Sequence, residues 1–175
     1  MKMHDATNLH FDLRLEWNGA LLSWALPIEL GCLSKSGDAV EMDDHRVENW
    51  KFEGVHWTGP MIVWDCGTWE PHPDFEDVGS SLEKGLLRFR LRGERLQCDC
   101  TLTLIDSSKI RPRWSLAIQT ETETHENLIQ VQPISILSGK TMDEVVWEWN
   151  HPEDRHPGQG NLFGSAGADE ALQLS

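Results

Sequence analysis

The chain of 175 residues is long enough for one domain with a hydrophobic core and too short for two. Its formal charge of −14 argues against a general grip on nucleic-acid phosphates. The sequence shows no signal peptide, no apolar run of membrane-spanning length and no paired cysteine spacing of a zinc ribbon. We therefore expect a soluble cytoplasmic protein with no membrane partner.

The first half of the chain predicts short antiparallel strands. After an irregular lead-in, residues 9–17 alternate strictly between apolar and polar side chains and end at Asn18-Gly19, a strong hairpin signal. Residues 20–27 return as the second strand, which Pro27 ends. Further strand signals follow at 39–45, 51–54, 61–71, within 86–105 as two strands joined at Arg92-Gly93-Glu94, and at 113–119.

These seven or eight strands predict an all-β fold with little helix, either an antiparallel barrel or a sandwich. Residues 72–84 are rich in Pro, Asp, Glu and Ser and predict a loop, whereas 141–150 is the one segment that favours a helix. We expect a core domain over 1–120, an extension with a strand or short helix over 121–150, and a disordered tail over 151–175.

The alternating strand carries a row of polar residues on one face. Side chains two apart in a strand project from the same side, so His10, Asp12 and Arg14 stand together. If His4 folds back from the lead-in, two imidazoles and a carboxylate form a ligand set for a divalent transition metal. A solvated strand face explains the same pattern, and on spacing alone it is the favoured interpretation.

A family resemblance reverses that balance. The segment HDATNLHFDLRLEWNGALLSWALP, followed in order by DDH, FEG, MIVWDCGTWEP, LRGERLQ and RWSLAIQ, is similar to the 3′-phosphoesterase module of bacterial DNA ligase D and its free-standing relatives. The similarity runs from His4 to Gln119. It implies an antiparallel β-barrel and a manganese-dependent enzyme that trims DNA or RNA-tipped 3′ ends during end joining, with a DNA ligase or another end-joining protein as partner.

The resemblance also implies roles for individual residues. Carried over by position, His4, His10 and Asp12 would bind Mn²⁺ or another divalent transition metal, and His10, Asp12, Arg14 and His45 would form the catalytic set. Arg14 and His45 would contact the substrate phosphate. For His45, the alternative is a histidine that caps a strand end.

Several positions depart from the family pattern and leave a second function open. Neutral residues stand where the family usually has a tyrosine, a lysine and an arginine, at Asn49, Ile28 and Gly37, and Lys2 replaces a glutamine. A catalytically weakened, metal-binding interaction module is therefore the alternative to an enzyme, and a plain scaffold is the third hypothesis. Arg88 and Arg90 are candidate nucleic-acid contacts, although a solvated strand face explains them as well.

Overall fold

The all-β class is confirmed, and the strands form one antiparallel sheet. The computed structural model describes residues 1–27, 36–74, 77–108, 110–119 and 133–154. Within these ranges the sheet has ten strands in the order β5-β6-β1-β2-β3-β4-β10-β9-β8-β7. In chain order the strands are β1 Lys2–Asp5, β2 Leu9–Trp17, β3 Ala20–Pro27, β4 Ser36–Arg46, β5 Gly54–His56, β6 Gly59–Val63, β7 Gly67–Pro71, β8 Leu86–Gly93, β9 Gln97–Asp106 and β10 Arg113–Gln119.

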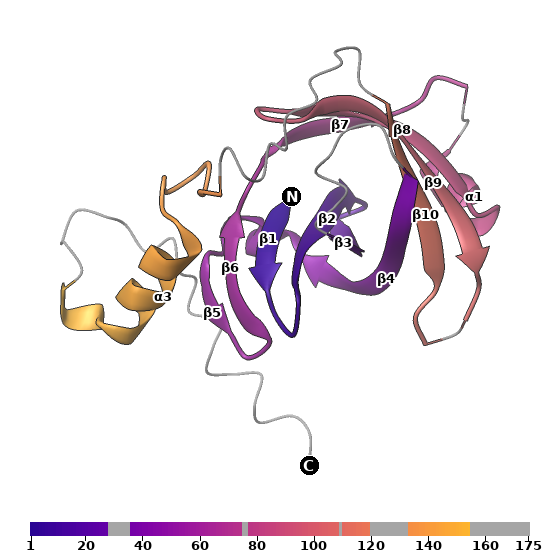
Figure 1. Ribbon diagram of the computed structural model, residues 1–175. Helices are drawn as coiled ribbons and strands as arrows, with labels where there is room; N and C mark the ends of the chain where they lie inside the picture. The colour runs from indigo at the N-terminus through magenta and orange to yellow at the C-terminus, as the bar shows by residue number, and fades with distance from the viewer. Residues whose placement is uncertain (28–35, 75–76, 109, 120–132, 155–175) are drawn as a thin grey trace.

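The expected closed barrel is wrong. The sheet curls around the core (Figure 1), but no ladder joins its end strands β5 and β7 within the described residues. A barrel needs every strand to pair on both sides. Here the predicted single strand over 61–71 breaks into β6 and β7, and residues 64–66 cross the opening between them. Isolated hydrogen bonds hold this crossing, including one from the Trp64 amide to the Met1 carbonyl and one from the Glu94 amide to the Cys66 carbonyl.

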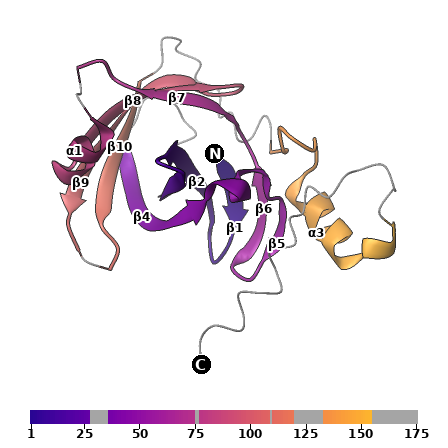
Figure 2. The same cartoon turned by 180° about the vertical axis from the view of Figure 1, so that it is seen from behind.

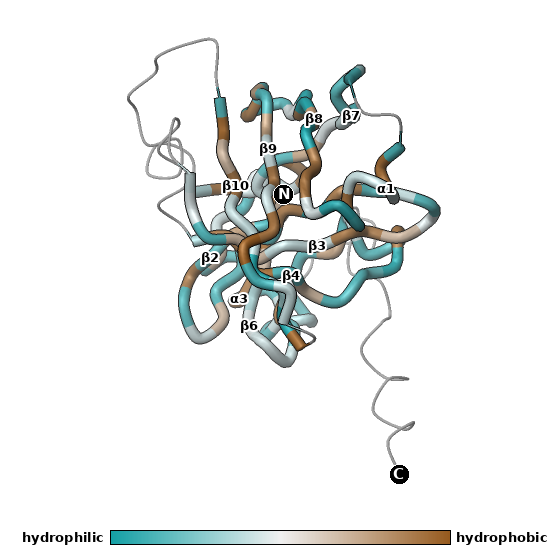
Figure 3. The backbone as a smooth tube through the Cα atoms, turned by 90° about the vertical axis from the view of Figure 1, so that its right-hand side faces the viewer, coloured by the Kyte–Doolittle hydropathy of each residue, from teal (hydrophilic) through white to brown (hydrophobic). Residues whose placement is uncertain are grey.

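The β2–β3 hairpin forms as the sequence predicts. Asn18 and Gly19 have φ values of 50° and 80°, the left-handed pair that a two-residue turn requires. The register places Leu13 opposite Trp24 and Phe11 opposite Leu26, and all four side chains are buried. Polar and apolar residues alternate along the strands (Figure 3), so one face packs into the core and the other is free for polar groups.

The lead-in is not irregular, because β1 is an inner strand of the sheet. It pairs with β2 on one side and β6 on the other, with His4 directly opposite both His10 and Met61. A four-residue strand carries too short a pattern to be recognised from sequence. Its hydrogen-bonding partners on both sides, rather than its own preference, fix its conformation.

Helices are few and lie at opposite ends of the sheet (Figures 1 and 2). The predicted helix forms as α3, Met142–Asn150, with a capping box at Thr141, and it packs against β5 and β6. A second helix, α1 at Val78–Glu83, was missed inside the expected loop; its N-cap is Asp77, whose carboxylate accepts the Ser80 amide at 2.7 Å. Two 3₁₀ turns complete the described helices, η2 at Val47–Lys51 and η3 at Pro152–Asp154.

None of the described helices has the length and apolar character needed to cross a membrane. Half of the predicted strand around 128–137 lies outside the described residues; in the described half, 133–137, Ile134 forms an isolated bridge with Thr141 and no strand is present. The predicted tail over 151–175 falls largely outside the described residues. The division into core, extension and tail stays a prediction.

Candidate metal and phosphate site

The three predicted metal ligands lie together on the face of the sheet that does not pack into the core. The β1–β2 register sets His4 opposite His10 and Lys2 opposite Asp12. The His4 and His10 ring centroids are 4.8 Å apart, and one ligand atom from each of His4, His10 and Asp12 lies within 4.8 Å of the others. Such a cluster of two imidazoles and a carboxylate can bind a divalent transition metal.

Hydrogen bonds select the ring nitrogen that each histidine would offer. Nδ1 of His10 donates to the carbonyl of Asn8 at 2.8 Å, which leaves Nε2 facing Asp12 Oδ1 at 3.2 Å. Nε2 of His4 lies 3.0 Å from Thr58 Oγ1, which leaves Nδ1 facing Asp12 Oδ2 at 3.8 Å. Metal-binding histidines usually donate their other ring N–H in this way. The donor set therefore fits a metal ion.

The electrostatics of the cluster keep the Asp12 carboxylate ionised. Burial alone would raise the pKa of Asp12, but the hydrogen bond from His10 and the nearby charge of Arg14 outweigh burial and lower the pKa to about 2. The same hydrogen bond raises the pKa of His10. Burial lowers the pKa of His4, which keeps that ring neutral. The cluster thus presents an anionic oxygen and at least one neutral imidazole.

Arg14 joins the cluster from the next position on the same face. Its Nη2 donates to Asp12 Oδ2 at 3.0 Å, and its side chain is only 8% exposed. Its buried Nε has no hydrogen-bond partner among the described residues. A guanidinium with an unused buried donor is a strong binder of a phosphate oxygen.

A β-bulge brings His45 onto the site face. On β3, Ser23 pairs with Met42 and Leu21 pairs with His45, so β4 carries one extra residue between the two pairs. The extra residue reverses the alternation of β4. Without it, His45 would share the core face of Glu41; with it, the imidazole lies on the same side as Arg14.

The surroundings of His45 favour the neutral imidazole. The Ser23 hydroxyl donates to the Leu21 carbonyl at 2.9 Å and lies 3.0 Å from His45 Nδ1, so the ring donates Nδ1–H to that oxygen. Burial and then the charge of Arg14 lower the pKa of His45. A strand-end cap would need no such partner within the site.

Lys2 is a site-face residue for which sequence analysis assigned no role. Its side chain is buried, and Nζ donates to the carbonyls of Asn49 and Phe52 at 2.8 and 2.7 Å. Burial, and then the charge of Arg14, lower the pKa of Lys2 to about 7. The sequence signal that could have placed Lys2 on the site face is its spacing of two residues from His4. Ser23 and Thr58 were also missed, because their roles depend on pairing between strands that are distant in sequence.

The two candidate nucleic-acid contacts on β8 lie apart from this cluster in the sheet order. Both nitrogens of the Arg90 fork bind Asp99, at 2.7 and 2.8 Å, and Arg88 is exposed. Four strands, β3, β4, β10 and β9, separate β8 from β2 in the sheet order. A role for Arg88 or Arg90 in binding nucleic acid stays a prediction.

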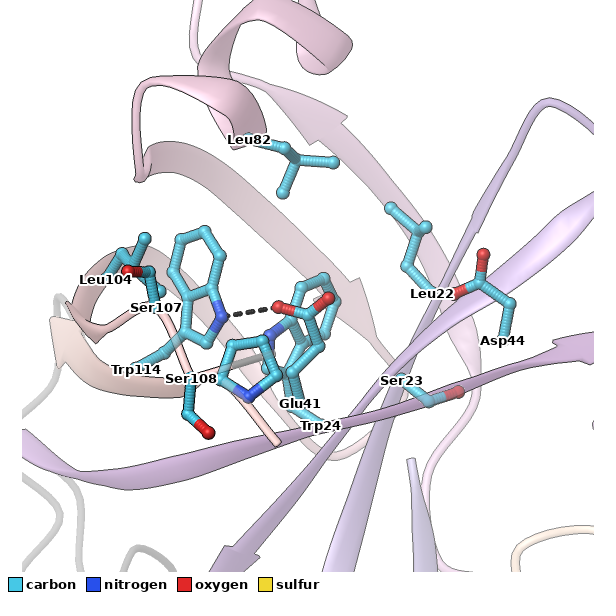
Figure 4. A pocket seen from close by; sticks show the side chains of 11 residues that line it. Leu22, Ser23, Trp24, Glu41, Asp44, Leu82, Leu104, Ser107, Ser108 and Trp114 are labelled. Carbon is cyan, nitrogen blue, oxygen red and sulfur yellow. Dashed lines mark hydrogen bonds between the residues drawn. The ribbon is translucent and has the colours of Figure 1, made fainter. Parts of the chain in front are cut away.

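A cavity of about 300 Å³ lies beside Trp24 and Trp114, on the core side of β3 and β4 (Figure 4). Nε1 of Trp114 donates to Glu41 at 2.6 Å within it. Apolar groups from Leu22, Leu82 and Leu104 form much of its wall. The cavity does not include the metal-binding cluster.

The departures from the family pattern have different structural settings. Asn49 lies in η2, where its carbonyl accepts from Lys2, so the backbone at this position is still tied to the site. Gly37 lies on β4 and pairs with Leu116 of β10. Ile28 lies outside the described residues.

Comparison with known proteins assigns the chain to a family. A family described as "DNA Ligase D 3′-phosphoesterase domain" matches residues 2–104, more than half of the chain. The chain is 34% identical over 153 residues to the multifunctional non-homologous end joining protein LigD of Pseudomonas aeruginosa, covering 81% of this chain and 18% of that protein. It is 36% identical over 80 residues to the non-homologous end joining DNA repair protein LigD of Mycobacterium tuberculosis, covering 42% of this chain and 10% of that protein.

The chain thus spans between a tenth and a fifth of the length of these relatives. The matched range includes every strand that supplies the candidate ligands, from β1 to β4. The predicted resemblance is therefore confirmed, and the chain belongs to the DNA ligase D 3′-phosphoesterase domain family.

Proposed function

We propose that this chain is a metal-dependent 3′-phosphoesterase that converts damaged or ribonucleotide-tipped DNA 3′ ends into 3′-hydroxyl ends during end joining. The observation that carries this proposal is the buried Arg14 guanidinium, with an unpaired Nε, beside His4, His10 and Asp12. A cation site next to an unsatisfied phosphate donor fits a phosphate ester better than it fits a structural metal.

His4, His10 and Asp12 would hold the metal, which we expect to be Mn²⁺ from the family resemblance. When bound, such an ion neutralises phosphate charge and makes a bound water more acidic. In the hydrolysis of a 3′-phosphate, water attacks phosphorus and the bond from phosphorus to the 3′ oxygen breaks. A free 3′-hydroxyl and inorganic phosphate result.

Arg14 and His45 supply the protein's share of this reaction. Arg14 binds the phosphate oxygens and stabilises the charge that grows during attack. The pKa of His45 is low in the free protein, but an incoming phosphate brings negative charge that raises it again. The protonated ring then donates from Nε2 to the departing 3′ oxygen.

The test uses a 5′-labelled primer annealed to a template and ending in a 3′-phosphate or a single ribonucleotide. With Mn²⁺ we expect a 3′-hydroxyl product from both substrates, and with EDTA none. No product with the protein in excess over substrate would reject the proposal. Ligation of the treated ends by an added DNA ligase would further support a role alongside such a partner.

A His10→Ala variant tests the ligand assignment. It should lose both Mn²⁺ binding, measured by calorimetric titration, and turnover. His72→Ala is the matched control, because His72 is partly exposed and pairs with Asp74 away from the cluster. Turnover that survives in His10→Ala would show that the ligand set is wrong.

The alternative, a metal-binding interaction module of the same fold, is favoured by the neutral residue at Asn49 and by the net charge of −14. In that case Mn²⁺ would raise the melting temperature of the protein without any release of phosphate. The same protein preparation can be used for both measurements.

A further inference from the structure

The tip of the β5–β6 hairpin carries an indole that has no place in the catalytic set. Trp57 is 88% exposed, whereas most other large apolar side chains described are buried. Its ring lies 5.5 Å from that of His56, centroid to centroid. A single exposed apolar residue needs no explanation by itself. The position of Trp57 in the chain, next to a residue that contacts a candidate metal ligand, does need one.

Thr58 joins the hairpin tip to the site. Its Oγ1 lies 3.0 Å from Nε2 of His4, and Trp57 is the adjacent residue, with a Cα about 3.8 Å from that of Thr58. The exposed indole therefore belongs to the residue next to the one that hydrogen-bonds a candidate metal ligand.

The tip of the β5–β6 hairpin is anchored to the β1–β2 turn. Gly59 has φ +136°, and a Cβ there would lie 2.0 Å from the carbonyl oxygen of Asp5. Only glycine allows this approach of the hairpin to the β1–β2 turn. The β1–β6 ladder, with His4 opposite Met61, fixes the same segment from the side. Trp57 is therefore presented by an anchored turn, so binding through it orders little of the chain.

The arrangement of charged residues along the site face also favours the end at which the β5–β6 hairpin lies. Along the site face the order is Thr58, then His4 and His10, then Arg14, then His45, because strand pairing sets these residues in sequence. Glu16, which follows Arg14 on the same face of β2, is exposed and repels a phosphate backbone. At the hairpin end, Asp5 is exposed.

We propose that Trp57 is a stacking platform for the base of the 3′-terminal nucleotide, a subsite that rests on the proposed phosphoesterase function. Bases stack on an exposed indole whatever their identity, so the platform would secure the end of a strand without reading its sequence. It also supplies binding energy that does not depend on positive charge, which this acidic protein has in short supply.

The experiment is a double-mutant cycle between protein and oligonucleotide. The probe is a 5′-fluorescein duplex that ends in a non-hydrolysable 3′-methylenephosphonate, with either a normal terminal base or an abasic residue. Affinity is measured by anisotropy in Mn²⁺. Removing the base should weaken binding to the native protein about tenfold, whereas Trp57→Ala should bind both probes with the same reduced affinity.

Two further variants define the result. Trp57→Phe should keep most of the base dependence, and Trp147→Ala, which alters a half-exposed tryptophan on α3, should bind both probes as the native protein does. An equal loss on base removal in native protein and Trp57→Ala would overturn the platform. So would the absence of measurable binding by the native protein.

Failure of the proposed function would look different. In that case the 3′-phosphate primer would not be hydrolysed, yet the coupling between Trp57 and the terminal base would still appear in the binding measurement. If the primer is hydrolysed but no coupling between Trp57 and the base is seen, the proposed function is supported and the stacking platform is rejected. Melting curves of Trp57→Ala would verify that this exposed substitution leaves the fold intact.

Discussion

Asp12 is the residue to which the candidate site is most closely tied. Its carboxylate lies within 4 Å of ring nitrogens of His4 and His10 and of the Arg14 guanidinium, and it is buried. A buried carboxylate in this setting stabilises the fold while it is ionised, and under the proposed function it would also provide the anionic ligand of the metal set. Stability and metal binding would then depend on the same proton equilibrium.

The pKa of Asp12 predicts how stability changes in acid. The carboxyl titrates near 3.8 in the unfolded chain and at about 2 in the fold, so the unfolded state takes up the proton first as pH falls. The contribution, about 2 kcal/mol, is fully present above pH 4 and is lost as pH drops toward 2. Denaturant unfolding in EDTA across this range should show a steeper loss in the native protein than in Asp12→Asn. Parallel curves would contradict the assignment.

At the scale of elements, the β5–β6 hairpin sets the orientation of a ligand on another strand. Thr58 accepts the Nε2–H of His4 and has His56 Nδ1 at 3.1 Å as a further partner, so the hairpin selects Nδ1 of His4 for the metal. Partners of this kind typically affect metal affinity by about ten- to a hundredfold.

Thr58→Val should therefore weaken Mn²⁺ affinity at least about tenfold without loss of folded structure, because it keeps the side-chain shape and removes the hydrogen bond. Thr58→Ser should restore the affinity. The measurement is calorimetric titration with Mn²⁺, and Thr68→Val on the exposed β7 strand is the control. Equal affinities of Thr58→Val and native protein would show that the hydroxyl does not orient His4.

The bulge in β4 predicts a separation of binding from catalysis. His45→Ala removes the imidazole that the bulge places on the site face, opposite Leu21. Mn²⁺ binding should persist, because β1 and β2 are unchanged, whereas 3′-phosphate hydrolysis should fall by two orders of magnitude or more, the range typical of general acid catalysis. Circular dichroism checks the fold, and His72→Ala, away from the cluster, is the control. Unimpaired hydrolysis by His45→Ala would remove His45 from the mechanism.

Sequence reasoning succeeded where the signal was local. The alternation of His10, Asp12 and Arg14 and the Asn18-Gly19 turn are read over neighbouring residues, and both are present in the structure. It failed where pairing between distant segments decides. Neither β1 as an inner strand, nor the β4 bulge, nor the break between β6 and β7 leaves a mark in a short window of sequence.

At the scale of the whole molecule, the net charge of −14 bears directly on how the protein meets DNA. The described cationic groups of the site are few, and arginines elsewhere are largely paired, such as Arg92 with Glu70 and Arg113 with Asp38. Under the proposed function, affinity for DNA would therefore come from the terminal phosphate and the base beside it rather than from a long stretch of backbone.

The salt dependence of DNA affinity measures how many backbone phosphates the protein contacts. Each phosphate neutralised contributes about −0.9 to the slope of log affinity against log salt. With contacts confined to the site, the slope should be shallower than about −3. A steeper slope that falls in an Arg88→Ala, Arg90→Ala double variant would instead place backbone contacts on the β8 hairpin.

The candidate metal ligands all come from one hairpin, between positions 4 and 12, and metal binding there would have a consequence for how the protein folds. Closing so short a loop costs little chain entropy compared with pairing β4 to β10. An ion captured by the nascent hairpin would hold it until the distant strands arrive. Metal supply during synthesis would then govern the yield of native protein as well as its turnover.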